Sequence, residues 1–317
     1  NMVEHFSYQI KHYGKILNAN RSYYLTRTQP PFFSSMITEV FEKLKLNTSW
    51  LKEQLNWAFT EYEQVWMQKD VRLTNNGLNR YKAQGLGLPP ETEAGHYNAL
   101  LKPYAVAKGM SIEKYEKAYY NREIENAELD NYFVHDRSVR ESGHDTSYRI
   151  EANCAHLNLL ELNCMLFKYE TDFAHLLHTY FNGEFHFNNK VFTSDYWKTQ
   201  AKKRKDIMNA LMWNGTLGTY FDFNFITKKQ HIFYAPSQLF PLWAKLCTTE
   251  QAEKIVNRVL PQLTEQGGLA GCSKSSLDQV KNKTIERQWD YPNGWPPHQI
   301  ITWQGLLNYG FVDQAQD

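Results

Sequence analysis

Residues 288–297 combine side chains that could bind a sugar. The run Gln-Trp-Asp-Tyr-Pro-Asn-Gly-Trp-Pro-Pro contains two indoles, a carboxylate and three prolines. Because proline lacks a backbone N–H donor and restricts the residue before it, the run is expected to form a rigid, irregular loop. Indole faces pack against the C–H patches of a pyranose ring, and Gln288 and Asp290 can hydrogen-bond its hydroxyls. A structural turn with two core tryptophans is the alternative, and the local sequence leaves both open.

A second candidate site lies in the segment Arg-Glu-Ser-Gly-His-Asp that begins at Arg140. Gly143 has no Cβ and would let the backbone approach a ligand closely. Asp145 follows it and could serve as a catalytic acid. The same aspartate could instead cap the next helix, which is the more ordinary role for this residue type at a helix start.

Two further loops carry polar side chains suited to hydroxyl recognition. Arg27, Thr28 and Gln29, with Asn18 upstream, offer several donors and acceptors within a short distance along the chain. Glu91 follows two prolines that would hold it rigidly. The structural alternatives are a turn in which Arg27 pairs with a surface acid, and a solvated loop acid at Glu91.

The elements that position these loops are predicted to be mostly helical, in one domain that covers residues 1–317. Apolar residues recur at spacings of three to four over 51–66, 162–181 and 249–263, and the last segment opens with a capping box formed by Thr248 and Gln251. A possible small β-hairpin lies near 219–234, with 219–225 as one strand and 231–234 as its partner. If consecutive helices form pairs in a ring, alternate junctions fall at the same end, and the polar loops gather into one binding site.

Composition favours a neutral ligand. The chain has 35 Lys and Arg against 34 Asp and Glu, so its net charge is only +1. No strong field is available for nucleic acid or an anionic membrane, and we predict neither as a partner. The aromatic share is high at 15%, which together with neutrality favours a carbohydrate.

Cysteine usage predicts a reducing compartment and no metal site. Cys154, Cys164, Cys247 and Cys272 match no zinc or redox spacing, and small buried thiols are their ordinary explanation. No apolar run approaches membrane length. The chain begins at Asn1 with helical periodicity already under way, so we expect it to be a piece of a longer polypeptide.

Together, the four segments resemble the trehalase family. The run QWDYPNGW is similar to the family's C-terminal signature, Gln-Trp-Asp-x-Pro-x-Gly-Trp-x-Pro. In the same order along the chain, GKILNANRSYYLTRTQPPF, LPPETE and ESGHDTSYR resemble its asparagine and Arg-Ser-Gln-Pro-Pro segments, its acidic loop and the segment with its catalytic acid. His144 stands where bacterial and animal members more often have tryptophan, as in the neutral, cytosolic trehalases of fungi.

The resemblance implies an (α/α)6 toroid that hydrolyses α,α-trehalose to two glucose molecules with inversion. It assigns Asp145 as the general acid. The residues that it implies for holding the two glucosyl units are Asn18, Arg27, Thr28, Gln29, Glu91, Arg140, Gly143, Gln288, Trp289 and Asp290. Thr28 replaces the usual serine and keeps its hydroxyl, whereas Pro89 replaces an arginine of bacterial members, so that contact does not transfer. Because an arginine beside Asp145 would lower its pKa, we expect Arg140 to face the sugar or another acid.

The family's general base is expected beyond residue 317. In trehalases it is a glutamate beyond the segment that QWDYPNGW resembles, and the N-terminal Pro-Gly-Gly-Arg-Phe signature would precede Asn1, so the toroid is predicted to be incomplete at both ends. Glu141, Glu161 and Asp290 are not assigned as the base merely because they are acidic. A trehalose-binding or regulatory toroid without turnover is therefore the alternative function.

Cofactor and partner predictions follow from the same resemblance. Two carboxyl groups and a water suffice for the reaction, so no cofactor is expected in this chain. Fungal neutral trehalases carry a calcium-binding region and a phosphorylated tail that binds 14-3-3 proteins, and both would lie upstream of the matching part. We therefore expect trehalose as the partner of this chain, a 14-3-3 protein only for the full-length enzyme, and a cytoplasmic location.

Overall fold

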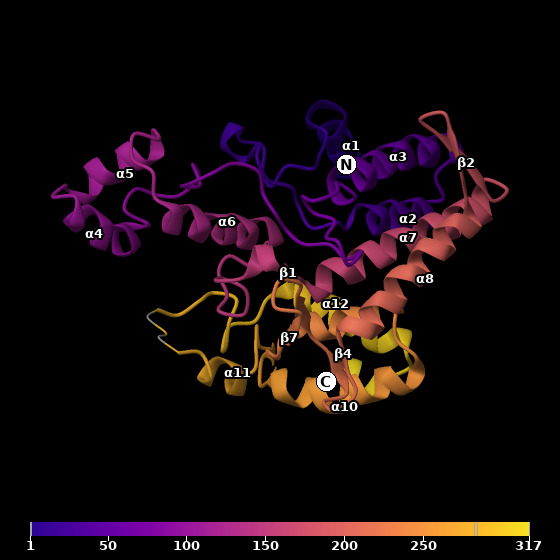
Figure 1. Ribbon diagram of the computed structural model, residues 1–317. Helices are drawn as coiled ribbons and strands as arrows, with labels where there is room; N and C mark the ends of the chain where they lie inside the picture. Colours follow the sequence, from indigo (N-terminus) through magenta and orange to yellow (C-terminus); the bar gives the residue numbers. More distant parts are fainter. Residues whose placement is uncertain (1, 282, 284, 317) are drawn as a thin grey trace.

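The computed structural model describes residues 2–281, 283 and 285–316, and its architecture is mostly helical (Figure 1). The longer helices are α1 (Met2–Tyr13), α2 (Phe33–Leu44), α3 (Thr48–Glu61), α4 (Asn98–Ala107), α5 (Ile112–Tyr120), α6 (Ala127–Ser142), α7 (Leu160–Tyr180), α8 (Ser194–Leu211), α10 (Thr249–Leu263) and α12 (Pro296–Asn308). Short helices are α9 (Phe240–Trp243), α11 (Lys274–Asp278) and α13 (Val312–Gln316). A π-helical turn, Tyr62–Trp66, continues α3.

Helix α7 is the central element of the core. It is apolar on most of its circumference, as expected for a helix with neighbours on several sides. Leu162, Leu166 and Phe173 pack with α1, α2 and α3, whereas Leu160 and Met165 pack with the elements that follow α8. The sequence periodicity over 51–66 and 162–181 thus correctly predicted α3 with its π turn, and α7.

The N-terminal half of the core is rich in aromatic side chains. Phe59 of α3 lies at its centre, with ring centroids 4.3 Å from Phe173 and 5.2 Å from Trp197 of α8. The β2–β3 hairpin (Glu184–Phe187 and Lys190–Thr193) joins α7 to α8 and adds Phe185 to this cluster at 5.1 Å. These contacts fix α3, α7 and α8 against one another.

In the C-terminal half, apolar side chains of α8, α9, α10 and α12 share one cluster. The predicted capping box is present at the start of α10, where the Thr248 hydroxyl accepts from the Gln251 amide and the Gln251 side chain accepts from the Thr248 amide. The three prolines predicted an irregular loop over residues 288–297, but helix α12 already begins at Pro296. Pro is well tolerated in the first helical turn, where the missing N–H would have no partner in any case.

Helices α4 and α5 pack together with the first half of α6 around a separate apolar cluster. In Figure 1 this group projects sideways from the rest of the molecule. The second half of α6 leaves this cluster and enters the main body, where His135–Ser142 are all buried although most of them are polar. Helix α6 therefore carries a run of buried polar side chains into the region where the loops meet.

The small sheets partly match the predicted hairpin. Strands β6 (Asp222–Asn224) and β7 (Lys229–His231) pair antiparallel with Asp222 opposite His231, and β1 (Leu157–Asn158) flanks β6. The second strand was predicted at 231–234, which is wrong, because a tight turn at 225–228 closes the hairpin earlier. The remaining pairs are β4 (Trp213–Asn214) with β5 (Thr219–Tyr220), and β8 (Thr264–Glu265) with β9 (Gly268–Leu269). Within the described part of the chain, every helix is too short or too polar to cross a membrane.

Candidate active site

Four loops that are far apart in the sequence meet at the end of α6. The loop before α2 contacts the loop near 91 through Arg27 and Glu91, whose charged atoms are 2.7 Å apart. The tryptophan loop, defined here as residues 287–295, meets the segment after α6 through the Trp289 amide, which donates to the Thr146 carbonyl at 3.2 Å. The predicted gathering of these polar loops in one place is therefore confirmed.

The loop before α2 is folded back on itself. Leu17 and Thr28 form an antiparallel bridge, which brings Asn18 beside Arg27 and Gln29. An Arg27 guanidinium N–H donates to Asn18 Oδ1 at 2.9 Å, and the side-chain amide of Gln29 donates to the backbone carbonyl of Asn18 at 2.7 Å. Three predicted sugar ligands thus share one rigid unit with Glu91.

Thr28 lies beneath this unit. Its side chain is fully buried, its hydroxyl donates to the Ile16 carbonyl at 2.8 Å, and its amide donates to Glu141 at 3.1 Å. These bonds hold the loop in place. A direct contact between Thr28 and a sugar stays a prediction.

Polar side chains on α6 and in the neighbouring segment before α4 hold Arg140 in place. Its Nε donates to Asp136 Oδ2 at 2.9 Å, and the Tyr97 hydroxyl donates to the same oxygen at 2.7 Å. The remaining guanidinium end lies 3.2 Å from His96 Nε2. Arg140 therefore pairs with another acid rather than with Asp145, in agreement with the expectation from the sequence.

Asp145 stands just beyond the end of α6, and Gly143 shapes this end. Gly143 terminates the helix with φ of +80°, a conformation that favours glycine. The Asp145 carboxylate forms no ion pair with a lysine or arginine of the described ranges. Partial burial raises the pKa of Asp145, while the charges of Arg140 and Arg27 oppose this rise. A carboxyl in such surroundings can remain protonated where an exposed one would not.

The tryptophan loop closes over this turn. Trp289 stacks on Trp295 with ring centroids 4.3 Å apart, so one of its faces is covered. The Gln288 side chain donates to the Asp145 carbonyl. Asp290 is buried and accepts from the Ser147 hydroxyl at 2.7 Å and the Tyr148 amide at 2.8 Å. These bonds make Asp290 a brace between two loops, and a sugar contact by Asp290 stays a prediction.

Sequence reasoning missed the buried ion pairs that support these loops. Glu141 is completely buried and accepts from Arg72 at 2.5 Å, from the Thr28 amide and from the Lys82 amide at 2.9 Å. One carboxylate thereby ties three segments to α6. Arg137 of the same helix donates to the carbonyls of Gly87 and Leu88, at 2.8 and 2.7 Å, and holds the loop that leads to Glu91.

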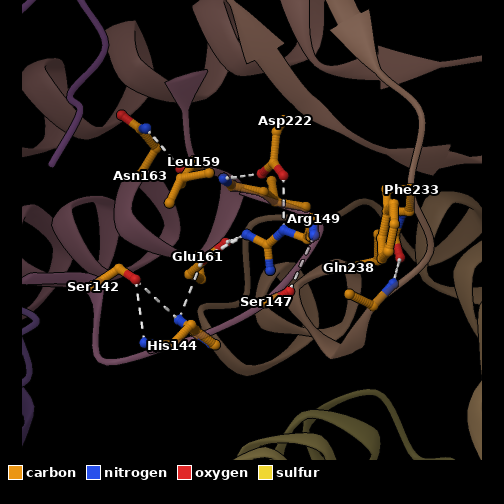
Figure 2. Close-up of polar contacts among 12 residues, drawn as sticks. Ser142, His144, Ser147, Arg149, Leu159, Glu161, Asn163, Asp222, Phe233 and Gln238 are labelled. Carbon is orange, nitrogen blue, oxygen red and sulfur yellow. Dashed lines mark hydrogen bonds and ion pairs between the residues drawn. The ribbon is translucent and has the colours of Figure 1, made fainter. Parts of the chain in front are cut away.

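A second ion cluster surrounds Arg149, which follows Asp145 in the same segment (Figure 2). Arg149 donates to both oxygens of Glu161, at 2.6 and 2.7 Å, and to Asp222 of β6 at 2.9 Å. The second Asp222 oxygen accepts from the Leu160 amide at 2.8 Å and caps the start of α7. The segment after α6 is thus fixed to both α7 and the β6–β7 hairpin.

One signal in the sequence could have located these supports. The second half of α6 reads His-Asp-Arg-Ser-Val-Arg-Glu-Ser and is polar or charged at every position except Val139, although all of these residues are buried, which is unusual for a helix inside a protein. Buried charges are normally paired, so such a run predicts several arginine and carboxylate partners elsewhere in the chain. It does not say which residues they are.

Two further observations concern other sites. A cleft of about 860 Å³ lies between residues 70–80 and the β6–β7 hairpin, and its lining includes none of the predicted site residues. In the part of the chain that the structure describes, no group of three or more His, Cys, Asp or Glu side chains is arranged to hold a metal ion.

Comparison with known proteins identifies close relatives of this chain. A family model described as trehalase matches residues 1–317. The chain is 44% identical to a cytosolic neutral trehalase of Neurospora crassa over 99% of its own length and 44% of the relative's. It is 42% identical to a cytosolic neutral trehalase of Saccharomyces cerevisiae over 98% of its length and 42% of the relative's. The chain therefore spans less than half the length of these curated relatives.

Solved structures agree with this relationship. A neutral trehalase from Saccharomyces cerevisiae superposes with a TM-score of 0.93 at 43% identity, over 98% of this chain and 57% of that one. A mannosylglycerate hydrolase from Thermus thermophilus gives a TM-score of 0.54 at 14% identity, over 92% of this chain and 65% of that one, and this likeness concerns the fold alone. The predicted fold class, a mostly α-helical (α/α)6 toroid, is confirmed.

Proposed function

This chain belongs to the trehalase family, and on that premise we propose that it hydrolyses α,α-trehalose to two glucose molecules, with Asp145 as the general acid. Trehalose joins two anomeric carbons, so the departing group is a sugar alkoxide. Such a group leaves readily only if an acid protonates the glycosidic oxygen as the bond breaks. The proton donor is therefore the residue on which the proposal depends most.

Asp145 carries this proposal because its carboxyl, unlike those of Glu91, Asp136 and Glu141, forms no ion pair with an arginine of the described residues. Burial raises its pKa, which keeps a fraction of the group protonated at higher pH than an exposed aspartate. Its position after Gly143 and beneath the tryptophan loop places it at the meeting point of the four loops. The carboxyl groups of Glu91, Asp136 and Glu141 are each committed to an arginine.

The sugar contacts in this proposal come from the surrounding loops. We assign the two glucosyl units to Asn18, Arg27, Thr28, Gln29, Glu91, Arg140, Gly143, Gln288, Trp289 and Asp290. Within this set, Arg27 has an Nε–H that is buried without a hydrogen-bond partner among the described residues, which suits it to bind a ligand oxygen. Thr28 and Asp290 contribute mainly by holding the loops.

A general base outside residues 1–317 completes the mechanism. An inverting glycosidase needs a carboxylate about 6.5 to 9.5 Å from the acid, with room for a water. Glu161 is bound by Arg149, and both oxygens of Asp290 accept hydrogen bonds from the segment after Asp145. These bonds support placing the base beyond residue 317. Two carboxyl groups and a water then suffice, and the proposal includes no cofactor.

Asp145→Asn in the protein expressed from its complete gene tests this function. Glucose release from trehalose should fall by roughly 10²–10⁴-fold because the amide cannot supply the proton. Calorimetry should still detect trehalose binding to the variant. Asp195→Asn, at an exposed position of α8, is the matched control and should leave turnover unchanged. An active Asp145→Asn variant would refute the assignment, and binding without any turnover by the wild-type protein would indicate a trehalose-binding function.

The stereochemical course provides an independent check. Inversion at one anomeric carbon of α,α-trehalose releases one α- and one β-glucose, which proton NMR resolves before the anomers equilibrate. Two α-glucose molecules would contradict the inverting mechanism. Because the relatives are named cytosolic neutral trehalases, we also propose a cytosolic location for this protein.

A further inference from the structure

Two histidines, the buried His298 and the partly buried His144, form a pair next to the proposed acid. His144 directly precedes Asp145, and His298 lies in the first turn of α12. Their Nε2 atoms are 3.1 Å apart, and their rings are nearly parallel, with an interplanar angle of 22°. His298 is only 4% exposed, and its Nδ1 has no hydrogen-bond partner among the described residues.

The surroundings of His144 determine which nitrogen carries each proton. The Ser142 hydroxyl donates to the Val139 carbonyl at 2.7 Å, so it can only accept from His144 Nδ1, which lies 3.4 Å away. Glu161 Oε1, a second acceptor, lies 4.0 Å from the same nitrogen (Figure 2). His144 Nδ1 therefore carries its proton, and Nε2 is left with a lone pair.

His298 must then donate to His144. With the proton on Nε2, its Nδ1 is a buried acceptor without a partner. The opposite arrangement would leave a buried N–H of His298 without an acceptor and point the lone pair of His144 Nδ1 at the oxygens of Ser142 and Glu161. That arrangement leaves more polar groups unsatisfied, so the first one is favoured.

Both rings are neutral in this arrangement. Burial and the Arg149 charge lower the pKa of His144 to about 3, and burial, His144 and Arg149 lower the pKa of His298 well below its usual value. The pair therefore shares a single N–H···N bond over the pH range in which proteins normally work. A charged imidazole beside Arg149 would be repelled.

The pair also contacts the tryptophan loop. The Trp289 ring lies edge-to-face against both imidazoles, at centroid distances of 4.9 Å from His144 and 5.3 Å from His298. His298 in turn is fixed by its amide, which donates to the Trp295 carbonyl at 3.1 Å. One bond between imidazoles thus joins the start of α12 to the residue before the acid.

We propose that His298 is a positioning residue for the general acid, and that its Nε2–H holds His144 and thereby the turn that carries Asp145. This inference rests on the proposed function, because it assigns a role in the reaction of Asp145. Proton donation to the glycosidic oxygen depends on sub-ångström placement of the carboxyl, and misplacement by 1 Å can cost about 10²-fold in rate. Loss of the bond should therefore lower kcat, while KM changes little.

Kinetics of four His298 and His144 variants, two at His298, one at His144 and one double variant, test the proposal in the complete protein. His298→Met removes the donor and retains apolar bulk, and kcat should fall by about tenfold or more. His298→Gln places an amide N–H near the position of Nε2, and kcat should stay within about threefold of the wild type. In the His144→Met background, His298→Met should cause no further loss, because its partner is already gone. His178→Met, at an exposed position of α7, is the control.

The protonation of the two histidines can also be measured directly, without an activity assay. Nitrogen NMR of histidine-labelled wild-type protein should find His144 protonated on Nδ1 and His298 on Nε2, and it remains valid if the methionine variants fail to fold. Equal losses in the Met and Gln variants, losses that multiply in the double variant, or the opposite tautomers would overturn the inference. Wild-type protein without turnover would overturn the proposed function as well, whereas active wild type with unchanged kcat in His298→Met overturns this inference alone.

Discussion

The framework beneath the site and the turn that carries Asp145 treat a buried carboxyl group in opposite ways. In the framework, Glu141, Glu161 and Asp222 each receive at least two hydrogen bonds, and an arginine supplies the opposite charge. At the turn, Asp145 is partly buried without such a partner; burial raises the pKa of both Asp145 and Asp222, but only the Asp222 carboxylate is held by an arginine. The comparison separates two uses of burial: a paired carboxylate fixes loops, and an unpaired one is set up to exchange a proton.

Removal of the arginine from the framework should have the largest effect on stability. Arg149→Met would leave Glu161 and Asp222 buried without a counter-charge, and the free energy of unfolding should fall by about 3–5 kcal/mol. Urea denaturation measures this loss. Arg287→Met is the comparison, because Arg287 also binds a carboxylate through two nitrogens, at 2.6 and 2.9 Å from Glu151, but in a more exposed place. A loss of equal size in both variants would show that burial does not set the strength of these pairs.

Glu61 allows the effect of burying a carboxyl group without an ion-pair partner among the described residues to be measured through the free energy of unfolding. It is fully buried with Tyr169 and Trp66 as hydrogen-bond donors, and burial raises its pKa from 4.5 to about 7. The folded state therefore holds a proton that the unfolded state loses above pH 4.5, so stability should fall as the pH rises from 4.5 to 7. The shift corresponds to roughly 3 kcal/mol.

Glu61→Gln should remove this pH dependence. Unfolding free energies of the wild type and the variant, measured between pH 4.5 and 8, should converge at low pH and separate as the pH rises, with the variant more stable at pH 8. A difference that stays constant over this range would contradict the raised pKa. Glu39→Gln, at an exposed position of α2, is the control.

Asp136→Asn tests the positioning of Arg140. The amide retains the shape of the side chain but loses the charge that holds the Arg140 guanidinium, and KM for trehalose should rise about tenfold. The negative charge of Asp136 also raises the pKa of Asp145. Its removal should therefore lower that pKa, and the alkaline limb of the rate profile should move to lower pH.

The same helix offers a matched control for Asp136. Asp130 also accepts from a tyrosine and an arginine, at 2.6 Å from Tyr119 and 2.8 Å from Arg122, but it lies away from the four loops. Asp130→Asn should leave KM and the pH profile unchanged. A KM change of similar size in both variants would indicate a general loss of helix stability.

These contrasts also mark what the sequence could predict. The periodicity of α3, α7 and α10 depends on neighbouring residues, and it located these helices well. The segment with Gly143 and Asp145 and the tryptophan loop stood out as candidate sites because glycine, proline and tryptophan constrain a loop by themselves, but the local residues left their structural alternatives open. The resemblance to trehalases added the order of the segments, which local patterns alone do not interpret.

The partners of the buried charges could not be predicted. Arg72 and Glu141 are separated by 69 positions, and Arg149 and Asp222 by 73. Any arginine could pair with any acid until the fold is known. His298 was missed for the same reason, because a histidine at a helix start has no distinctive local signal. The hairpin partner was misplaced because turn geometry, not strand composition, determines register.

Removal of a solvent-exposed ion pair should have the smallest effect on the free energy of unfolding. Lys202 and Asp206 lie one turn apart on α8, 2.5 Å between charged atoms, with 76% and 58% of their side chains exposed. Water already solvates both charges, and holding two long side chains together costs entropy, so Lys202→Ala should change the free energy of unfolding by less than about 0.5 kcal/mol. Urea denaturation at low and high salt measures it. A loss that approaches that of Arg149→Met would mean that the pairing itself, rather than its removal from water, stabilises the fold, and the contrast between the framework and the Asp145 turn would then lose its physical basis.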